Sequence, residues 1–212
     1  KQMNKAICRK IFETFEKNNP SPKIELNYRS PFELLVAVLL SAQSTDVGVN
    51  KATPALFKRA NTPEKMAALS ETKLKTYIKT IGLYNHKAKN IIKTSKILVD
   101  QYKGKVPDNR EALENLPGIG RKSANVILNS AFGHATIGVD THVFRVSNRT
   151  KLATGKNVFD VEQKLNAIIP NAFKQHAHHW LVLHGRYICK AKKPDCAHCI
   201  INPLCEYEDK ER

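Results

Sequence analysis

The stretch LPGIGRKSANVIL, residues 116–128, joins a tight turn to the start of a helix. Pro117, Gly118 and Gly120 are turn-forming residues, whereas the second half of the stretch is largely apolar and contains no helix breaker. The pattern therefore predicts a helix that begins near Arg121 and follows a glycine turn. Glycines let a backbone pass close to a ligand and point its N–H groups outward, so such a turn can hold a phosphate.

The predicted helix opens with two cations, Arg121 and Lys122. A helix N-terminus carries a partial positive charge and is stabilised by acidic residues, so two cations there lower the stability of the helix. We therefore expect them to have a function, and a phosphate contact is the first candidate for Arg121. A nucleotide-binding P-loop, G-x-x-x-x-G-K-[ST], is disfavoured, because Asn115 replaces its first glycine and Arg121 precedes the lysine.

The net charge of the chain favours a polyanionic partner. Lys and Arg number 35 against 19 Asp and Glu among 212 residues, which gives a formal net charge of +16. Such an excess indicates nucleic acid first, although charge alone does not separate DNA from RNA. The longest apolar run, residues 34–40, is far shorter than the roughly 20 residues that span a bilayer, so we expect no membrane span. The basic N-terminal segment lacks the apolar core of a signal peptide, and we expect an intracellular protein.

Helical patterns dominate the chain and predict an all-α fold. Ser30 to Glu33 form a capping box with proline at the first helical position, which predicts a helix over Phe32 to Ala42. Asp108 to Glu111 repeat the device before a short helix that ends at Leu116. An amphipathic helix is expected at the N-terminus, and further helices near 46–59, 64–68, 71–79, 85–101, 141–151, 157–168 and 175–187.

Four of the five cysteines lie close together, at Cys189, Cys196, Cys199 and Cys205. Crowded cysteines in an intracellular chain bind metal more often than they form disulfides. Their spacing is compatible with a structural zinc site or with an iron–sulfur cluster. The outer gaps of six and five residues are longer than those of zinc knuckles and favour a [4Fe–4S] cluster. The fifth cysteine, Cys8, is predicted to be a buried apolar residue of the first helix.

Three lysines, Lys190, Lys192 and Lys193, lie between the first two of these cysteines. Metal ligation would hold this loop rigid and present the lysines on its surface, which suits contacts with phosphates. A solvated lysine loop without a partner is an equally good interpretation of this segment alone.

The chain resembles the helix-hairpin-helix DNA glycosylases in an ordered set of motifs, which are LLSAQSTD (39–46), IGLYNHKAKNI (81–91), LPGIGRKSANV (116–126), VDTHVFRVSNR (139–149), HHWLVLHGRYIC (178–189) and the cysteine spacing. The resemblance implies an all-α protein with two helical domains. One is a six-helix domain with the helix-hairpin-helix motif over 24–134. The other consists of 1–23 and 135–212 and carries a C-terminal [4Fe–4S] cluster loop.

The same resemblance implies a bifunctional DNA glycosylase and AP lyase that excises oxidised pyrimidines from duplex DNA, with Lys122 as the nucleophile and Asp140 as the catalytic carboxylate. An amine that attacks a sugar carbon must be neutral, whereas a free lysine has a pKa near 10.4. The positive charge of the helix N-terminus and of Arg121 would favour the neutral amine. Asp140 would activate that amine or stabilise the cationic sugar. Its simpler interpretation is the N-cap of a helix that begins at Thr141, and both can hold.

Two further residues are implied to act while a base is flipped out of the duplex. By resemblance, Gln43 fills the space that the base leaves and Leu83 wedges in from the opposite side. Leu83 could instead be a core leucine, but it lies in an apparent interhelix turn, where an exposed apolar residue is more often functional. Gly118, Gly120 and Arg121 are expected to contact the DNA backbone.

Two other functions remain open from the sequence. An adenine-mismatch glycosylase of the same fold carries a catalytic carboxylate on the helix that corresponds to 32–42, whereas residues 34–44 contain none. A non-catalytic DNA-binding module would need neither Lys122 nor Asp140. We expect a monomer that is cytoplasmic and associated with the nucleoid through DNA binding.

Overall fold

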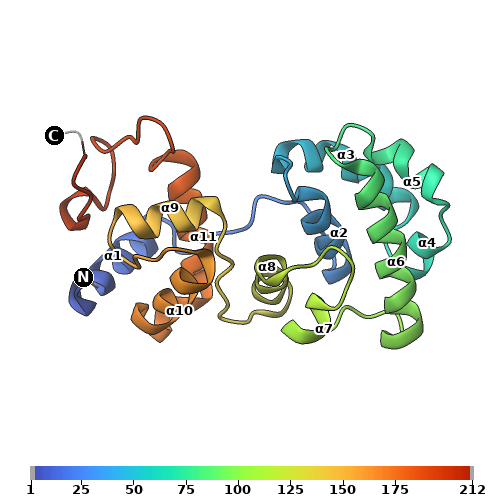
Figure 1. Ribbon diagram of the computed structural model, residues 1–212, viewed down its shortest axis with the longest axis horizontal. Helices are drawn as coiled ribbons and strands as arrows, with labels where there is room; N and C mark the ends of the chain where they lie inside the picture. The colour runs from blue at the N-terminus through green and yellow to red at the C-terminus, as the bar shows by residue number, and fades with distance from the viewer. Residues whose placement is uncertain (1–2, 211–212) are drawn as a thin grey trace. The chain divides into compact units, whose positions relative to one another are not determined.

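The computed structural model describes residues 3–210, which form eleven α-helices and one short 3-10 helix without any strand. The predicted all-α fold is therefore confirmed. None of the helices in this described part is long and apolar enough to cross a membrane. The chain forms two compact units, one over residues 25–133 and the other from the residues up to Ile24 and from His134 onward. In Figure 1 the first unit runs from light blue to olive, and the second combines dark blue with yellow to red.

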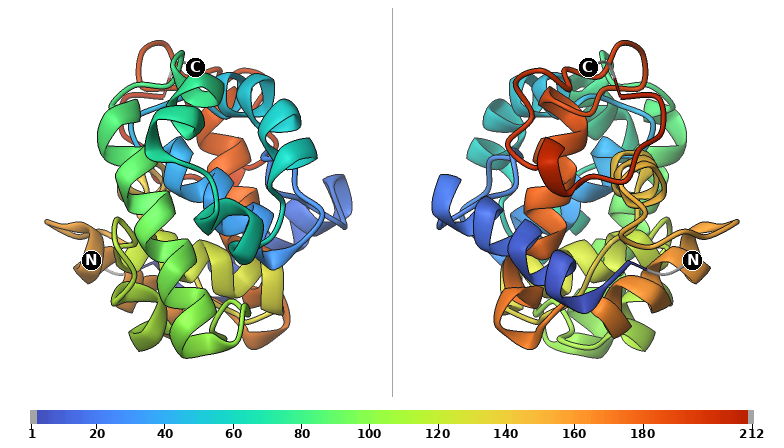
Figure 2. Two further views of the ribbon diagram at one scale, coloured as in Figure 1. Left: turned by 90° about the vertical axis from the view of Figure 1, so that its right-hand side faces the viewer. Right: turned by 90° about the vertical axis from the view of Figure 1, so that its left-hand side faces the viewer.

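The unit over residues 25–133 is built around one buried helix, α2. Every residue of α2 from 32 to 40 is buried, and all of them except Glu33 are apolar, which is typical of a core helix. It packs against α3, α6 and α8, and Figure 2 (left) shows it between the green α6 and the cyan α3. The helices of this unit are α2 (Pro31–Ser41), α3 (Asp46–Arg59), α4 (Pro63–Ala67), α5 (Glu71–Ile78), α6 (Tyr84–Tyr102), α7 (Arg110–Glu114) and α8 (Arg121–Phe132).

The other unit joins the N-terminal helix to the C-terminal third of the chain. Its elements are α1 (Lys5–Asn18), α9 (Thr141–Arg149), α10 (Val158–Ile168), α11 (Asn171–Tyr187) and the 3-10 helix η1 (Asn202–Leu204). Phe12 of α1 stacks on Phe173 with ring centroids 6.0 Å apart, and the indole N–H of Trp180 donates to the carbonyl of Asn19 at 2.8 Å. Cys8 is fully buried, as predicted. Figure 2 (right) shows α1 crossing α11, so the two ends of the sequence share one core.

Helix caps explain most helix starts, and most predicted starts lie within one residue of the observed ones. Ser30 caps α2 as expected, because its Oγ accepts from the N–H of Glu33 at 3.1 Å. In contrast, α7 is capped by Asn109, whose Oδ1 accepts from the N–H of Ala112 at 2.8 Å, and not by Asp108. The helix accordingly begins one residue later, and it ends at Glu114 before the predicted Leu116. The last helix, α11, begins at 171 instead of 175, directly after a proline that cannot lie further inside a helix.

Candidate active site and nucleic-acid interface

The glycine turn between α7 and α8 is anchored by two buried side chains, Leu116 and Ile119. The N–H of Ile119 donates to the carbonyl of Leu116 at 3.1 Å, which closes the turn. The hydroxyl of Thr94 donates to the carbonyl of Pro117 at 3.4 Å and links the turn to α6. The exposed backbone of the turn is therefore presented from a fixed base.

The two exposed glycines of this turn meet different surroundings. Gly118 has a left-handed φ of +82°, and a Cβ there would lie 2.8 Å from Nδ2 of Asn90 and 2.9 Å from Cδ2 of Leu39. This position needs glycine for its conformation, and a Cβ would also require the ends of these two side chains to shift. A Cβ at Gly120 would meet nothing within 4 Å, so the surface in front of it is open to a ligand.

The start of α8 is positive and carries no side-chain cap. Its N-cap is Gly120, no acidic residue lies in the first turn, and the helix begins at Arg121 as predicted. The first N–H groups of an α-helix have no partner within the helix, so this end favours an anion. Lys122 is exposed, which leaves its amine accessible to a substrate.

Two other turns of the same unit carry Gln43 and Leu83. Both residues are exposed and have left-handed backbone conformations, with φ of 54° and 58°. A Cβ at Gly82 would lie 3.7 Å from the carbonyl oxygen of Gln43, so the two turns are neighbours. A left-handed conformation costs a non-glycine residue about 1 kcal/mol, and such strain gathers at functional sites. Leu83 is 56% exposed, so it is not a core leucine.

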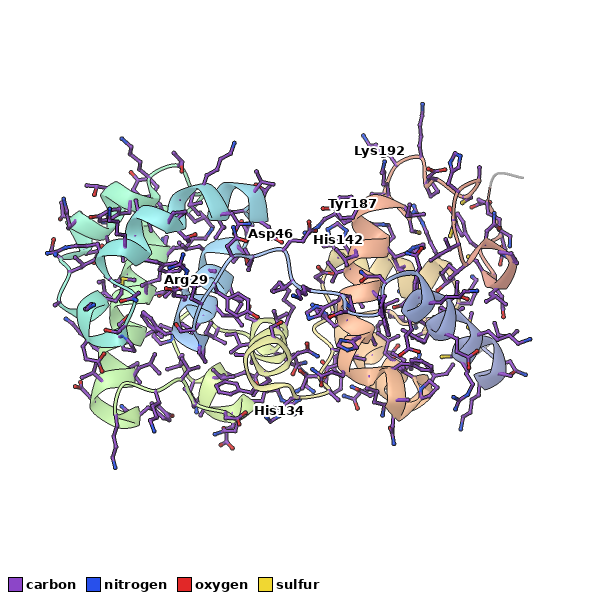
Figure 3. The ribbon with its side chains drawn as sticks, turned by 180° about the vertical axis from the view of Figure 1, so that it is seen from behind. Arg29, Asp46, His134, His142, Tyr187 and Lys192 are labelled. Atoms are coloured by element: carbon purple, nitrogen blue, oxygen red, sulfur yellow. The ribbon has the colours of Figure 1, made fainter. Side chains whose placement is uncertain are left out.

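Asp140 is the N-cap of α9, as one of the two sequence interpretations proposed. Its Oδ1 accepts from the N–H of Val143 at 2.8 Å, and the helix begins at Thr141. The carboxylate is partly exposed, and it contributes to the charge environment of Arg145 one turn further along. The cap therefore fixes a negative charge at the start of α9. His142 of the same helix is labelled in Figure 3.

The C-terminal loop brings the four clustered cysteines together. The pKa of Cys199 is raised to about 11, mainly by burial and in smaller part by the nearby thiols of Cys205, Cys189 and Cys196. Burial also raises the pKa of Cys205, and all five cysteines of the chain are free thiols. Among residues 3–210, no group of three or more His, Cys, Asp or Glu side chains is arranged to hold a single metal ion. The loop nevertheless places the four cysteine thiols near one another.

Two arginines of α9 hold this loop, and sequence reasoning missed them. The guanidinium of Arg149 donates to the carbonyls of Lys190 at 2.6 Å and Ala191 at 2.8 Å, and it lies 3.7 Å from Sγ of Cys189. Arg145 donates through Nε to the carbonyl of Cys189 at 2.9 Å. The two arginines are four residues apart and so lie on one face of the helix. This spacing within VDTHVFRVSNR was the available signal.

The three lysines of the loop, Lys190, Lys192 and Lys193, are all exposed. The loop is closed at its base, where the N–H of Asp195 donates to the carbonyl of Ile188 at 2.9 Å. Lys192 is labelled on this loop in Figure 3. Protein contacts therefore already order the lysine loop, in addition to any metal that its cysteines bind.

A cavity of about 1240 Å³ in the unit over residues 25–133 lies apart from these residues. It opens at the amino-terminal end of α2, whereas the Gln43 turn follows the carboxyl-terminal end of that helix. None of the predicted site residues lines it. Its lining includes Arg29, Phe32, Phe57 and Lys58.

Comparison with known families gives one match that covers more than half of the chain. The sequence profile of the family described as "HhH-GPD superfamily base excision DNA repair protein" matches residues 36–171. These residues include the Gln43, Leu83 and glycine turns, together with Lys122 and Asp140.

Curated relatives match along almost the whole chain. Endonuclease III of Escherichia coli (strain K12) is 62% identical over 208 residues, which cover 98% of this chain and 99% of the relative. Endonuclease III of Haemophilus influenzae is 60% identical over 208 residues, which cover 98% of this chain and 99% of the relative. Endonuclease III of Rickettsia conorii is 58% identical over 205 residues, or 97% of this chain and 98% of the relative.

Solved structures agree with this result. "Structure of a Trapped Endonuclease III-DNA Covalent Intermediate: Estranged-Adenine Complex" matches with a TM-score of 0.90 and 44% identity, covering 97% of each chain. A non-covalent Endonuclease III-DNA complex matches with the same TM-score and identity, covering 97% of this chain and 96% of that one. A thermostable thymine-DNA glycosylase, at 24% identity and a TM-score of 0.85, covers 95% and 96% and shows the fold alone.

The family match and the relatives confirm the resemblance to Endonuclease III and to the helix-hairpin-helix glycosylases. They also confirm a DNA glycosylase with lyase activity in base excision repair, so a non-catalytic DNA-binding module is not supported. The chain belongs to the HhH-GPD superfamily of base excision DNA repair proteins.

Proposed function

We propose that this protein excises oxidised pyrimidines from duplex DNA and then cleaves the strand at the abasic site through an imine on Lys122. The observation that carries the proposal is an exposed lysine in the first turn of α8, directly after the glycine turn, at a helix end without an acidic residue or a side-chain cap. A cation at that position lowers helix stability, so its presence favours a chemical role.

The reaction follows from an accessible amine. The nitrogen of Lys122 forms a bond to the sugar C1′, and the bond from C1′ to the damaged base breaks, so the base leaves with the electron pair and takes up a proton. The sugar ring then opens to an imine between C1′ and the lysine nitrogen. Loss of a proton from C2′ breaks the bond from C3′ to its phosphate oxygen, which cleaves the strand.

Asp140 would assist by accepting the proton of the attacking amine or by stabilising the cationic sugar. The cap bond to Val143 supports this role, because it holds the carboxylate in one orientation at the start of α9. A preorganised charge loses little free energy to reorientation during the reaction.

Gln43 and Leu83 would fill the duplex while the damaged base is extruded. Extrusion costs a few kcal/mol, and side chains that take the place of the base recover part of this cost. Gln43 and Leu83 are both exposed and have left-handed backbone conformations, which supports the proposal, because neither side chain packs in the core.

Double-stranded DNA that contains an oxidised pyrimidine or an abasic site is the proposed partner. Gly118, Gly120 and Arg121 would contact its phosphates through the start of α8, where an anion is favoured. Lys190, Lys192 and Lys193 would add charged contacts from their ordered loop.

The four clustered cysteines, Cys189, Cys196, Cys199 and Cys205, are proposed to bind a [4Fe–4S] cluster. Four free thiols that lie close enough to raise one another's pKa supply the all-cysteine donor set that such a cluster takes. When bound, the cluster supplies four iron–sulfur bonds that cross-link the C-terminal loop. Purified protein should show a broad visible absorption that Cys196→Ser abolishes, and colourless protein with stoichiometric zinc would contradict this assignment.

The proposal includes two domains, a helix-hairpin-helix domain over 24–134 and a cluster domain from 1–23 with 135–212, in a monomer that acts on cytoplasmic, nucleoid DNA. The first domain was expected to have six helices, whereas the structure has seven there, α2 to α8. The compact units found over residues 25–133 and in the rest of the chain support the division. Sedimentation with and without a DNA duplex measures the oligomeric state, and a dimer in both samples would contradict this part.

Incubation with three duplexes, carrying thymine glycol, an abasic site or an adenine mismatch, tests the substrate class. We expect excision and strand cleavage with the first, cleavage with the second and no reaction with the third. Excision of mismatched adenine without strand cleavage would favour the adenine-mismatch glycosylase instead.

A further inference from the structure

Lys87 is a buried lysine whose ammonium group contacts the Gln43 turn. It lies in the first turns of α6 and is 5% exposed. Its Nζ donates to the carbonyl of Leu40 at 2.9 Å and to Oγ of Ser44 at 3.0 Å. Both acceptors are uncharged, and within residues 3–210 Lys87 forms no ion pair with a carboxylate. Burial lowers the pKa of Lys87, so this cation is kept at the expense of its hydration.

The two acceptors lie on either side of Gln43. Leu40 belongs to the last turn of α2, where carbonyl groups have no partner within the helix and the helix dipole favours a cation. Ser44 follows Gln43 directly, before α3 begins at Asp46. The two hydrogen bonds therefore fix where the chain leaves α2 and where it continues after Gln43.

The backbone of the same lysine contacts the Leu83 turn. The N–H of Lys87 donates to the carbonyl of Leu83 at 3.1 Å, and Leu83 is the N-cap of α6 without a side-chain cap of its own. Gly82 lies against the Gln43 turn, because a Cβ there would be 3.7 Å from both the carbonyl of Gln43 and Oγ of Ser44. One residue thus binds both strained turns, through its ammonium on one side and its backbone on the other.

We infer that Lys87 is a positioning residue that holds Gln43 and Leu83 as one rigid pair, so that both side chains enter the duplex together when a base is extruded. The inference rests on the roles proposed above for these two residues. The gap that an extruded base leaves in the stack is filled only if the side chains of Gln43 and Leu83 both enter it. A fixed spacing between their two turns therefore favours extrusion of the base. A lysine suits this task because one ammonium group can donate to acceptors on two sides.

Lys87→Met tests the inference, since methionine keeps much of the stem and removes the ammonium group. Lys93→Met is the matched control, because Lys93 is an exposed lysine of the same helix. Single-turnover excision is measured on a duplex with paired thymine glycol, and strand cleavage on a duplex with an abasic site, whose sugar needs little extrusion. We expect Lys87→Met to slow excision about tenfold and to leave cleavage of the abasic duplex close to wild type. Lys93→Met should change neither rate.

Equal losses of Lys87→Met on both duplexes, together with a lower melting temperature, would show a merely structural lysine and overturn the inference. The wild-type protein reports on the proposed function in the same assay, whereas the ratio between the two duplexes reports on Lys87. The two failures are therefore distinguishable.

A second variant set keeps the test valid if Lys87→Met folds poorly. Ser44→Ala removes one acceptor and keeps the buried ammonium, so it should slow excision of paired thymine glycol by a smaller factor and spare the abasic duplex. In a background of Gln43→Ala and Leu83→Ala, Lys87→Met should add little further loss, because there is no longer a pair to position. Full additivity of the losses would contradict the inference.

Discussion

Gly118 is a residue at which a side chain would be strained and would displace its neighbours. Its φ of +82° is left-handed, and a Cβ would meet Asn90 and Leu39 at less than 3 Å. Gly118→Ala should therefore lower the free energy of unfolding by about 2 kcal/mol. Gly120→Ala is the matched control, because a Cβ there meets nothing within 4 Å, and it should change stability by less than about 1 kcal/mol. Urea unfolding measures both, and equal losses would contradict the assignment.

Asp140 combines a structural and a chemical role that two substitutions separate. Asparagine is as good an N-cap as aspartate, so Asp140→Asn should keep the cap of α9 and the melting temperature. The reaction should nevertheless slow about a hundredfold, because the negative charge is lost. Asp140→Ala should also lose about 1 kcal/mol of stability with the cap. If Asp140→Asn reacts at the wild-type rate, the residue is a cap alone.

Capping residues and other local sequence patterns predicted most helices, but they did not predict which parts of the chain each helix contacts. Ser30 and Pro31 marked the start of α2, because capping depends on neighbouring residues. The cap of α7 was misplaced by one residue, since Asp108 and Asn109 are both good caps and only the structure shows which one accepts from the N–H of Ala112. Lys87 was missed because its acceptor, the carbonyl of Leu40, lies 47 positions away in the sequence.

The roles of Gln43, Leu83, Lys122 and Asp140 were implied by the resemblance to a family and stay predictions. The structure places these four residues at turns or helix starts. The contacts that support such residues come from distant parts of the chain. Arg149 of α9, for example, reaches the backbone of Lys190 some 41 positions away.

The hydrogen bonds from Arg149 of α9 to the lysine loop can be tested by substitution. Arg149→Leu removes the donors to the carbonyls of Lys190 and Ala191, so the loop should lose its fixed conformation. DNA affinity should fall about tenfold, because a charge-assisted hydrogen bond contributes about 1.5–3 kcal/mol. Arg9→Leu on α1 removes the same charge from an exposed position and should have a much smaller effect. Fluorescence anisotropy with a labelled duplex compares the two, and equal losses would assign the effect to net charge.

For the whole molecule, the net charge of +16 predicts how DNA binding responds to salt. Each phosphate that the protein neutralises releases a counterion, so the logarithm of affinity should fall linearly with the logarithm of salt concentration, by about 0.9 per contact. Lys192→Gln should make this slope less steep by about one unit if Lys192 contacts a phosphate. A salt titration of the dissociation constant measures both slopes. Affinity independent of salt would contradict electrostatic binding.

Covalent chemistry at Lys122 is the central claim, and borohydride trapping tests it most directly, because only an imine is reduced to a stable link between protein and DNA. Wild-type protein that reacts with a thymine glycol duplex should be trapped, and peptide mapping should place the adduct on Lys122. Lys122→Gln should lose trapping and strand cleavage while it still binds an abasic duplex, and Lys122→Arg should behave alike, since arginine stays protonated. Trapping of Lys122→Gln at the wild-type rate would contradict the claim, and the cations that open α8 would then serve phosphate binding alone.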